Sequence, residues 1–309
     1  MNISAVIINY NGEKFLPGNL DSLGNQTKAF KQIIVVDNHS QDNSLKIIKQ
    51  YKGIELIEMG YNSGYACACN TGISRCDSDL ILVANSDTFF DLQFNARVAD
   101  KCLQDKTIAM ISPLILRFDA IHVDSAGQTR SLALYPREIG YNRELRKVNI
   151  QEGPVFSVCG AATVFRKSAL EKLKIRDEYY DEDFFTFWED FDLGWRANLL
   201  GLNVYFFPGA IAYHYRSGTM KKTRMSRISL SLGRSPDIKF HLVKNRYLTL
   251  IKNFRWSRFW WTLPFIFIKD LIWVGSLTLS SPQIIMKLIL SFKTIRKAQE
   301  KRKLIKKYE

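Results

Sequence analysis

The chain has 309 residues, of which 46% are hydrophobic and 24% are charged, an ordinary composition for a globular protein. This length suits one large domain, or one domain with an appendage, and it allows a sizeable core without disulfide bonds. The five cysteines have no framework spacing, and Met1 leads directly into an apolar run and not into a signal peptide. We therefore expect a reducing, cytoplasmic compartment and cysteines that pack as small apolar residues.

The net charge of +14 is unevenly distributed along the chain. Residues 1–214 contain 22 Lys and Arg against 26 Asp and Glu, a net charge of −4. Residues 215–309 contain 22 against 4, a net charge of +18. This basic last third predicts a polyanionic partner, either nucleic acid or an anionic membrane surface.

Short apolar runs alternate with segments of helical character in the first part of the chain. The expected strands are 3–8, 32–36, 54–57, 80–84 and 108–116, and the expected helices are 42–51, 64–75 and 92–103. This alternation predicts an α/β fold with a mostly parallel sheet and flanking helices. Ligands bind at the carboxyl ends of the strands in such sheets, so the residues directly after each run are candidates for a site.

Polar segments follow four of these runs, at residues 9–11, 37–40, 61–65 and 85–87. Any one of them alone reads as a turn or a helix cap. Because all four fall at consecutive strand ends, together they favour a binding site. A dinucleotide fingerprint and a P-loop are both absent from the sequence, which disfavours a nicotinamide enzyme or an ATPase.

Six sequence segments together resemble the family 2 glycosyltransferases of the GT-A fold, from about residue 3 to about residue 218. They are SAVIINYNG (4–12), IIVVDNHSQDNS (33–44), YNSGYACACNTGI (61–73), ANSDT (84–88), CGAATVF (159–165) and FWEDFDLGWRANLLG (187–201), and AIAYHY (210–215) follows. Within the family, the set is similar to bacterial enzymes of surface-polysaccharide and O-antigen synthesis, including rhamnosyltransferase-like ones. The resemblance implies a GT-A, Rossmann-like catalytic domain over residues 1–218 and a basic, aromatic, helical extension over residues 219–309.

The resemblance also implies residues for the nucleotide and the metal. Asp87 is the retained acid of the Asp-x-Asp motif, in which Asn85 replaces the first acid, and His214 matches a later metal ligand. The cofactor would be Mn²⁺ or Mg²⁺, and an imidazole ligand suits Mn²⁺. The alternative for His214 is a packed structural residue. The nucleotide-binding positions are Asn9, Asn11, Asp37 (toward a pyrimidine base), Asn62, Gly64 and Asn85.

An inverting transfer is a single in-line displacement, so one general base suffices. The family's base matches Asp190, preceded by Glu189, and the residues expected at the sugar or acceptor are Gly160, Trp188 and Arg196. The alternative is that these acids favour a helix N-terminus and the aromatic residues pack in the core. Asp192 and Arg196 have the i, i+4 spacing of a bracing ion pair. We expect the acidic run 177–183 to be a mobile, solvated loop over the acceptor site.

Residues 254–292 are apolar and aromatic, but Pro264 and Lys269-Asp270 interrupt them. A helix that spans a bilayer needs roughly 18 or more apolar residues, so a clean transmembrane segment is not expected. The tryptophans of this region predict an element that lies on the membrane surface, and the basic run 293–307 would attract anionic lipid. The alternative is a solvated basic helix with a buried hydrophobic hairpin at a subunit interface.

These observations lead to one functional hypothesis and two alternatives. The hypothesis is an inverting, metal-dependent hexosyltransferase at the inner face of the cell membrane, with a UDP- or dTDP-sugar donor, rhamnose included, and a glycan or polyprenyl-diphosphate-linked acceptor. One alternative is a nucleic-acid-binding protein that uses the basic region, but this leaves the strand-end motifs unexplained. The other is a non-catalytic sugar-binding relative, suggested by Asn85 and disfavoured by Asp87, Asp190 and His214. We expect no nucleic-acid partner, and the oligomeric state is not predicted.

Overall fold

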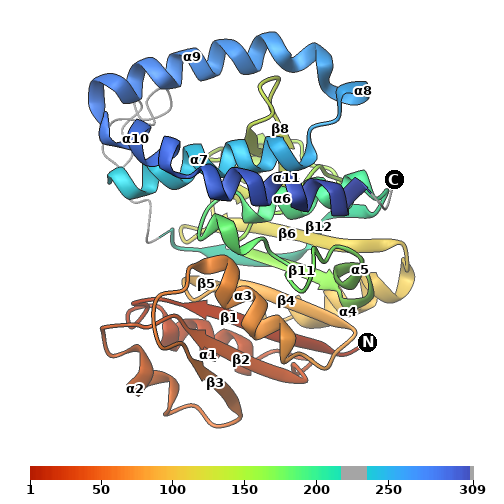
Figure 1. The fold of residues 1–309 in the computed structure, drawn as a ribbon. Coiled ribbons are helices and arrows are strands. Elements are labelled where there is room, and N and C mark those ends of the chain that lie inside the picture. Colours follow the sequence, from red (N-terminus) through yellow and green to blue (C-terminus); the bar gives the residue numbers. More distant parts are fainter. Residues whose placement is uncertain (217–234, 307–309) are drawn as a thin grey trace.

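The computed structural model describes residues 1–216 and 235–306. Its N-terminal half contains the predicted parallel strands, which lie side by side in the order β3-β2-β1-β4 (Figure 1). The strands are β1 (Ile3–Asn9), β2 (Gln32–Asp37), β3 (Ile54–Glu58) and β4 (Leu80–Asn85). Each begins where the sequence predicted and ends one residue later. Because all four are parallel, their carboxyl ends meet at one edge of the sheet.

The sheet continues beyond β4 with strands of both directions, in the order β4-β11-β6-β12-β10. Strand β11 is antiparallel to both of its neighbours, whereas β12 is parallel to β6. Two short strands pair at the periphery, β5 with β12 and β7 with β6, and β8 and β9 form a separate hairpin. The bounds are β5 (Thr88–Phe90), β6 (Ile108–Arg117), β7 (Val123–Ser125), β8 (Gln128–Arg130), β9 (Pro136–Glu138), β10 (Gly153–Pro154), β11 (Ala162–Arg166) and β12 (Asn203–His214).

Helices cover both faces of the sheet. One hydrophobic core joins the sheet to α1 (Leu16–Gly24), α2 (Ser44–Ile48) and α4 (Phe94–Gln104). The opposite core joins it to α3 (Tyr65–Ser74), α5 (Lys167–Lys172) and α6 (Glu189–Leu199). All seven residues of β1 are buried because they alternate between these two cores, which explains the unbroken apolar runs. The expected fold class, a mostly parallel sheet with flanking helices, is confirmed.

In the C-terminal extension (residues 219–309), the elements that the structure describes are all helices. Helix α7 (Pro236–Asn253) begins after Ser235, whose hydroxyl caps it, and packs against α6 and α11. A third core combines apolar residues of α7 and α11 with Trp188 and Phe191. The other elements are α8 (Trp256–Phe259), α9 (Leu263–Ser280), α10 (Gln283–Leu290), α11 (Phe292–Lys306), and the 3₁₀ helices η1 (Leu145–Lys147), η2 (Glu182–Phe184) and η5 (Trp260–Thr262).

Helix α9 lies farthest from the sheet, at the top of Figure 1, with α10, α7 and α11 between it and α6. Among the described residues, no helix has both the length and the apolar character needed to cross a membrane. The predicted domain boundary at residue 218 falls between 217 and 234, outside the described residues, so it stays a prediction. The contacts of α7 with α6 nevertheless mean that the extension and the N-terminal part share one core.

Candidate active site at the carboxyl ends of the strands

Asn9 and Asp37 lie at the ends of β1 and β2 and are hydrogen-bonded to each other. The buried Asn9 Nδ2 donates to Asp37 Oδ2 (2.8 Å) and to Ser40 Oγ (3.1 Å). Ser40 donates its backbone N–H to Asp37 Oδ1 (2.9 Å) and its hydroxyl to Oδ2 (2.7 Å). The backbone N–H of Asn11, which has a φ of +52°, also donates to Ser40 Oγ (2.8 Å). The structure therefore brings Asn9, Asn11 and Asp37 together in one network.

Asn62 and Gly64 follow β3 and face the loop that precedes α6. Asn62 Oδ1 accepts from Asn38 Nδ2 (3.1 Å) and from the Gly64 N–H (3.1 Å). Gly64 has a φ of +86°, and a Cβ there would lie 2.6 Å from the carbonyl oxygen of Phe185. Only glycine therefore fits this position, and it allows a close approach between the end of β3 and the α6 loop.

The β4–β5 turn brings Asp87 against His214, although 127 positions separate them in the sequence. Antiparallel pairing of β5 with β12 places His214 opposite Thr88. His214 Nε2 lies 3.2 Å from Asp87 Oδ1, and both side chains are buried. Burial alone lowers the pKa of His214, but hydrogen bonds to Asp124 and Asp87 raise it to about 9. A metal binds the neutral imidazole, so a cation here would replace the Nε2 proton. With that proton released, one carboxylate and one imidazole are donors that fit Mn²⁺, with other ligands completing the shell.

Asp124 in β7 is a site residue that the sequence analysis missed. Its fully buried carboxylate accepts from His214 Nδ1 (2.9 Å) and from Arg216 Nε. Burial by itself raises the pKa of Asp124, but these two partners hold it below its ordinary value. A metal-binding histidine commonly donates its second ring nitrogen to a carboxylate. That rule predicts a carboxylate partner for His214, but the sequence alone does not identify Asp124 as this partner.

Asp190 lies in the first turn of α6 and is half-buried. Its Oδ2 accepts from the Gly160 N–H (2.8 Å) and from Gln128 Nε2 (3.0 Å), and its Oδ1 accepts from the Phe191 N–H (2.7 Å). Burial raises the pKa of Asp190, whereas these hydrogen bonds lower it. Two of the predicted site residues, Asp190 and Gly160, are thus in direct contact.

Residues 160–162, which lead into β11, connect Asp190 with the turn that contains Asp87. The Gly160 N–H binds Asp190, and the next carbonyl, that of Ala161, accepts from the Asn85 N–H (3.1 Å) and from Thr88 Oγ1 (3.0 Å). Two consecutive residues therefore join Asp190 to Asn85 and Thr88, which lie on either side of the candidate metal ligand Asp87 in the sequence. The predicted catalytic and metal positions thus belong to connected segments.

Two more carboxyl groups, those of Glu189 and Glu138, lie near Asp190. Glu189 is buried, and its Oε2 has no hydrogen-bond partner among the residues that the structure describes. Burial, and then the nearby Asp190, raises the pKa of Glu189 to about 8. Glu138 in β9, which the sequence analysis missed, has its pKa raised to about 7 mainly by burial. Carboxyl groups with raised pKa values are typical of sites that move protons.

Trp188 and Arg196 do not face the site. Trp188 is 4% exposed and packs edge-on against Tyr135 and Phe191, with ring centroids 5.0 and 5.6 Å apart. The buried Arg196 donates to Asp192 Oδ2 (3.0 Å) and to the carbonyls of residues 173 and 179. The bracing pair of Asp192 and Arg196 therefore forms as predicted. We assign Trp188 and Arg196 to the support of α6 and withdraw their expected contact with the acceptor.

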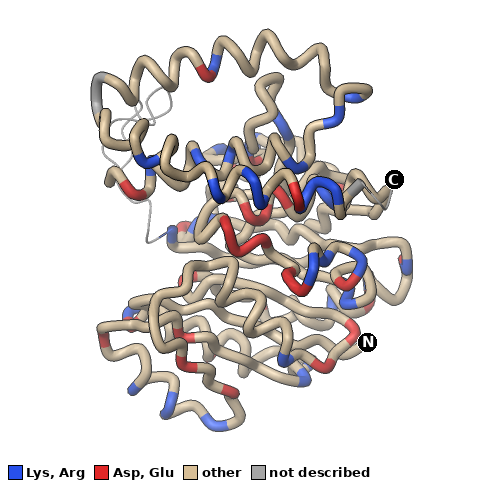
Figure 2. The backbone as a smooth tube through the Cα atoms, in the orientation of Figure 1, with Lys and Arg blue, Asp and Glu red and all other residues tan. Residues whose placement is uncertain are grey.

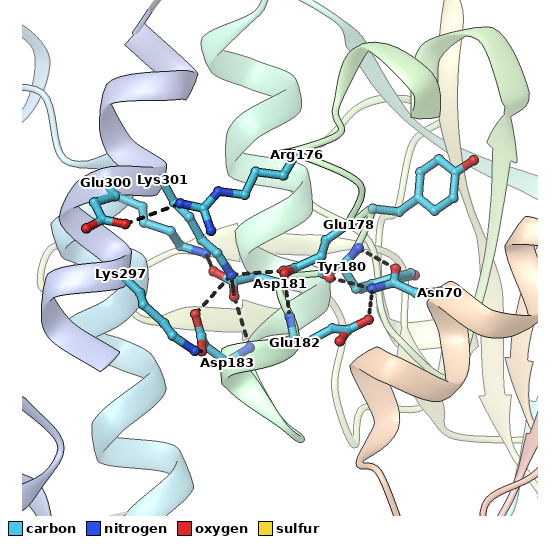
Figure 3. Close-up of polar contacts among 12 residues, drawn as sticks. Asn70, Arg176, Glu178, Tyr180, Asp181, Glu182, Asp183, Lys297, Glu300 and Lys301 are labelled. Atoms are coloured by element: carbon cyan, nitrogen blue, oxygen red, sulfur yellow. Dashed lines mark hydrogen bonds and ion pairs between the residues drawn. The ribbon is translucent and has the colours of Figure 1, made fainter. Parts of the chain in front are cut away.

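The acidic run 177–183 is not the solvated loop that the sequence suggested. Asp181 is 2% exposed and forms ion pairs with Lys252 of α7 and with Lys301 of α11. Figure 3 shows Lys301 between Glu178, Asp181 and Asp183, at 2.9, 2.6 and 2.9 Å. Basic residues of the C-terminal extension therefore hold this segment in place.

Asn245 of α7 holds the loop that leads into α6. This loop has positive φ angles at Phe185, Phe187 and Trp188, an uncommon conformation for large side chains. Asn245 Nδ2 lies within hydrogen-bond distance of the carbonyls of residues 184, 186 and 187, at 2.9, 2.7 and 2.7 Å. Helix α7 thus stabilises the backbone directly before Glu189 and Asp190.

Comparison with known proteins identifies the family of the chain. The sequence profile of glycosyl transferase family 2 matches residues 4–174, more than half of the chain. The poly-β-1,6-N-acetyl-D-glucosamine synthase of Staphylococcus epidermidis is 23% identical over 216 residues, which cover 68% of this chain and 49% of that protein. The chain therefore spans about half the length of this relative.

Two solved structures share the fold at low sequence identity. TarS of S. aureus in complex with UDP has a TM-score of 0.55 at 18% identity, and the match covers 82% of this chain and 67% of that one. The mannosyltransferase PcManGT of Pyrobaculum calidifontis, with GDP-Man and Mn²⁺, has a TM-score of 0.53 at 14% identity, over 99% and 85%. The chain has the GT-A fold and belongs to glycosyl transferase family 2.

Proposed function

We propose that the protein transfers a sugar from a nucleotide diphosphate to an acceptor hydroxyl with inversion at the anomeric carbon. The observation that carries this proposal is the link through Gly160 and Ala161, which puts Asp190 beside the Asp87 turn. Asp190 takes the proton of the acceptor hydroxyl, whose oxygen then displaces the diphosphate. Its raised pKa favours this role, because a base works best when its pKa is near the operating pH.

Asp87 and His214 are the proposed ligands of Mn²⁺ or Mg²⁺. A cation bound there would offset the negative charge that develops on the diphosphate as it leaves. Asp124 keeps the His214 ring oriented so that Nε2 points toward Asp87. Mn²⁺ is named with one of the structures that share this fold, which supports the metal without identifying it.

The proposed donor is a UDP- or dTDP-sugar, with rhamnose among the candidate sugars, bound by Asn9, Asn11, Asp37, Asn62, Gly64 and Asn85. UDP in the TarS complex supports a pyrimidine nucleotide. The acceptor would be a glycan or a polyprenyl-diphosphate-linked glycan of cell-surface polysaccharide synthesis, O-antigen included. The name of the Staphylococcus epidermidis relative, a polysaccharide synthase, supports that class of product.

The proposed location is the cytoplasmic face of the cell membrane, with α8–α10 against the lipid. More than half of the large hydrophobic side chains that are exposed in the described residues belong to residues 256–292. They include Trp256, Trp260, Leu271 and Leu290, which are 65%, 63%, 63% and 74% exposed. Figure 2 shows an almost uncharged α9 above the basic residues of α7 and α11. This combination of an apolar face with nearby positive charge suits an anionic bilayer surface.

Thermal unfolding in the presence of nucleotide sugars tests the donor and the metal together. We expect UDP- or dTDP-sugars to raise the melting temperature in the presence of Mn²⁺, since a ligand of the folded state stabilises it. Asp87→Ala should remove the Mn²⁺-dependent part of this shift, and His214→Ala should reduce it. A shift that excess chelator leaves unchanged would disprove the metal assignment.

Co-sedimentation with anionic vesicles tests the membrane location. Replacing Trp256 and Trp260 with serine should weaken binding, whereas Leu103→Ser, at a residue 50% exposed on α4, serves as the control. Binding should fall as the salt concentration is raised, but a salt-resistant part should remain because the tryptophan rings insert into the lipid. Binding to duplex DNA with no preference for vesicles would instead support the nucleic-acid alternative.

A further inference from the structure

Gln128, at the start of β8, is held rigidly beside α6. Its side chain is 4% exposed, and it lies directly opposite Glu138 in the β8–β9 hairpin. Its backbone N–H donates to the Ser157 carbonyl (2.8 Å), and its own carbonyl accepts from the Ser157 N–H (3.1 Å). Ser157 Oγ in turn donates to the Asp190 carbonyl (2.9 Å). The distance between Gln128 and Asp190 is therefore fixed through the backbone.

The amide of Gln128 bridges two carboxyl groups. Nε2 lies 2.9 Å from Glu138 Oε1 and 3.0 Å from Asp190 Oδ2, so each of its two hydrogens has one acceptor. The opposite orientation would point the amide oxygen at both carboxylates, where like partial charges repel. Glu138, itself bound to the hydroxyl of Ser125, thus helps to keep the nitrogen of Gln128 turned toward Asp190.

Because of this bridge, the two carboxylate oxygens of Asp190 have different hydrogen-bond partners. Oδ2 accepts from Gln128 and from the Gly160 N–H, whereas Oδ1 accepts from the Phe191 N–H as its one partner among the described residues. A carboxylate oxygen has two lone pairs, so Oδ1 keeps one that is open.

We infer that Gln128 and Glu138 are positioning residues for the base, with Oδ1 of Asp190 as the atom that accepts the proton. The inference rests on the proposed role of Asp190. In the transfer step the acceptor O–H gives its proton to Oδ1, and its oxygen forms the new bond to the anomeric carbon. The bond from that carbon to the phosphate oxygen breaks, and its electron pair leaves with the nucleotide diphosphate.

The two residues act on Asp190 in different ways. Gln128 donates to the carboxylate and so favours its ionised form. The charge of Asp190 is itself among the causes that raise the pKa of Glu138 to about 7, so Glu138 acts on Asp190 through the amide that it holds and not through a charge of its own. The other ionisable groups that act on this cluster are Glu189, Tyr180 and Cys159, with Arg216 acting on Glu138. Loss of Gln128 should therefore raise the pKa of Asp190, and loss of Glu138 as the partner of the amide should raise it by less. Glu138→Gln keeps an oxygen that accepts from the amide, so it should restore the Asp190 pKa, which general loosening of the fold would not do.

Carbon-13 NMR titration of the full chain with carboxyl-labelled aspartate tests the inference directly. Asp190→Asn identifies the Asp190 resonance. We expect Gln128→Met to raise its pKa by about one pH unit, the effect of one hydrogen bond to a charged group. Glu138→Met should raise it by less, and Glu138→Gln should leave it near the wild-type value. Gln26→Met is the matched control, because Gln26 is a buried glutamine whose Nε2 donates to the carbonyls of residues 22 and 91, away from α6. It should leave the Asp190 pKa where it is.

Kinetics with the nucleotide sugar that gives the largest thermal shift adds a second measurement. Gln128→Met and Glu138→Met should lower kcat by about 10- to 100-fold while the KM for the donor changes little, since only the base is misplaced. An Asp190 pKa that Gln128→Met leaves unchanged, or that Glu138→Gln shifts as much as Glu138→Met does, would overturn the inference. The titration needs no turnover, so a failure of the proposed function, seen as full activity in Asp190→Asn, is separate from a failure of the bridge.

Discussion

Two groups of acidic residues lie in or near α6, and they differ in whether they form ion pairs with basic side chains. The first group, Glu178, Asp181, Asp183 and Asp192, is paired with lysines and an arginine. Lys301 contacts three of these acids, and Lys252 contacts Asp181 and Asp192. The second group is Glu138, Glu189 and Asp190. In the described part of the chain none of these three forms an ion pair, and hydrogen bonds support Glu138 and Asp190.

The pKa values follow this difference. Burial alone raises the pKa of Asp181, but Lys252 and Lys301 bring it far below its ordinary value. With no such partner, burial raises the pKa of Glu138 to about 7 and that of Glu189 to about 8. The two groups of acidic residues therefore have different roles. The paired group fixes the backbone before α6, and the unpaired group remains available to bind protons near neutral pH.

The largest effect should come from the unpaired group. Asp190→Asn keeps the shape of the side chain and removes the proton acceptor, so kcat should fall by about 10²- to 10⁴-fold. Donor binding, measured by calorimetry, should change little. The control is Asp183→Asn, an acid of the paired group, which should keep most of its turnover. If Asp190→Asn retained most of the wild-type kcat, the base would be another acid, and Glu189 would be tested next.

A stability measurement probes the paired group. Lys252→Met removes one cation from buried Asp181 and Asp192, and breaking a buried ion pair costs about 3–5 kcal/mol. Lys297→Met is the matched control, since this exposed lysine also pairs with an acid of the group, Asp183, and exposed pairs contribute about 1 kcal/mol or less. Urea unfolding would measure both variants. Equal losses in the two would mean that burial of the pair does not matter here.

The two groups should also respond to pH in opposite ways. Because the folded state lowers the pKa of Asp181, its contribution to stability is present above its ordinary value of 3.8 and is lost as the pH falls. Glu189 has its pKa raised from 4.5 to about 8, so its contribution is present at low pH and is lost as the pH rises toward 8.

Glu189→Gln should therefore gain stability relative to the wild type as the pH rises from about 5 to 8, by about 1 kcal/mol or more, since one pKa unit is worth about 1.4 kcal/mol. Melting temperatures across this range would measure the gain. Asp183→Asn serves again as the control from the paired group and should show no such increase. A difference between Glu189→Gln and wild type that stays constant with pH would mean that Glu189 is ionised throughout.

The N-terminal half of the site was predictable from local patterns. The apolar runs gave β1–β4 to within one residue at each end, and a parallel arrangement then required that the segments after these strands share an edge. Asn9 with Asp37, and Asp192 with Arg196, meet as expected. In each case the periodicity of a strand or helix is enough to bring the partners together.

Sequence analysis did not find the residues that support the base. Asp124, Gln128 and Glu138 come from short strands without a strong apolar pattern, and they reach the site only because β7–β9 fold back against β6 and α6. The basic extension was interpreted as a surface for polyanions, yet Lys252 and Lys301 are buried against Asp181. Composition counts charges but does not distinguish a solvated lysine from one that neutralises an interior carboxylate.

The sequence by itself determined the parallel strands β1–β4 and the polar edge where Asn9, Asp37, Asn85 and Asp87 gather, because short-range periodicity decides which side chains are buried. Only the tertiary structure decided which acids are balanced and which are not. That depends on contacts between residues more than 50 positions apart, such as Lys301 with Asp181 and Gln128 with Asp190. The pKa of a buried carboxyl group is set by its immediate neighbours, and packing across the whole chain selects them.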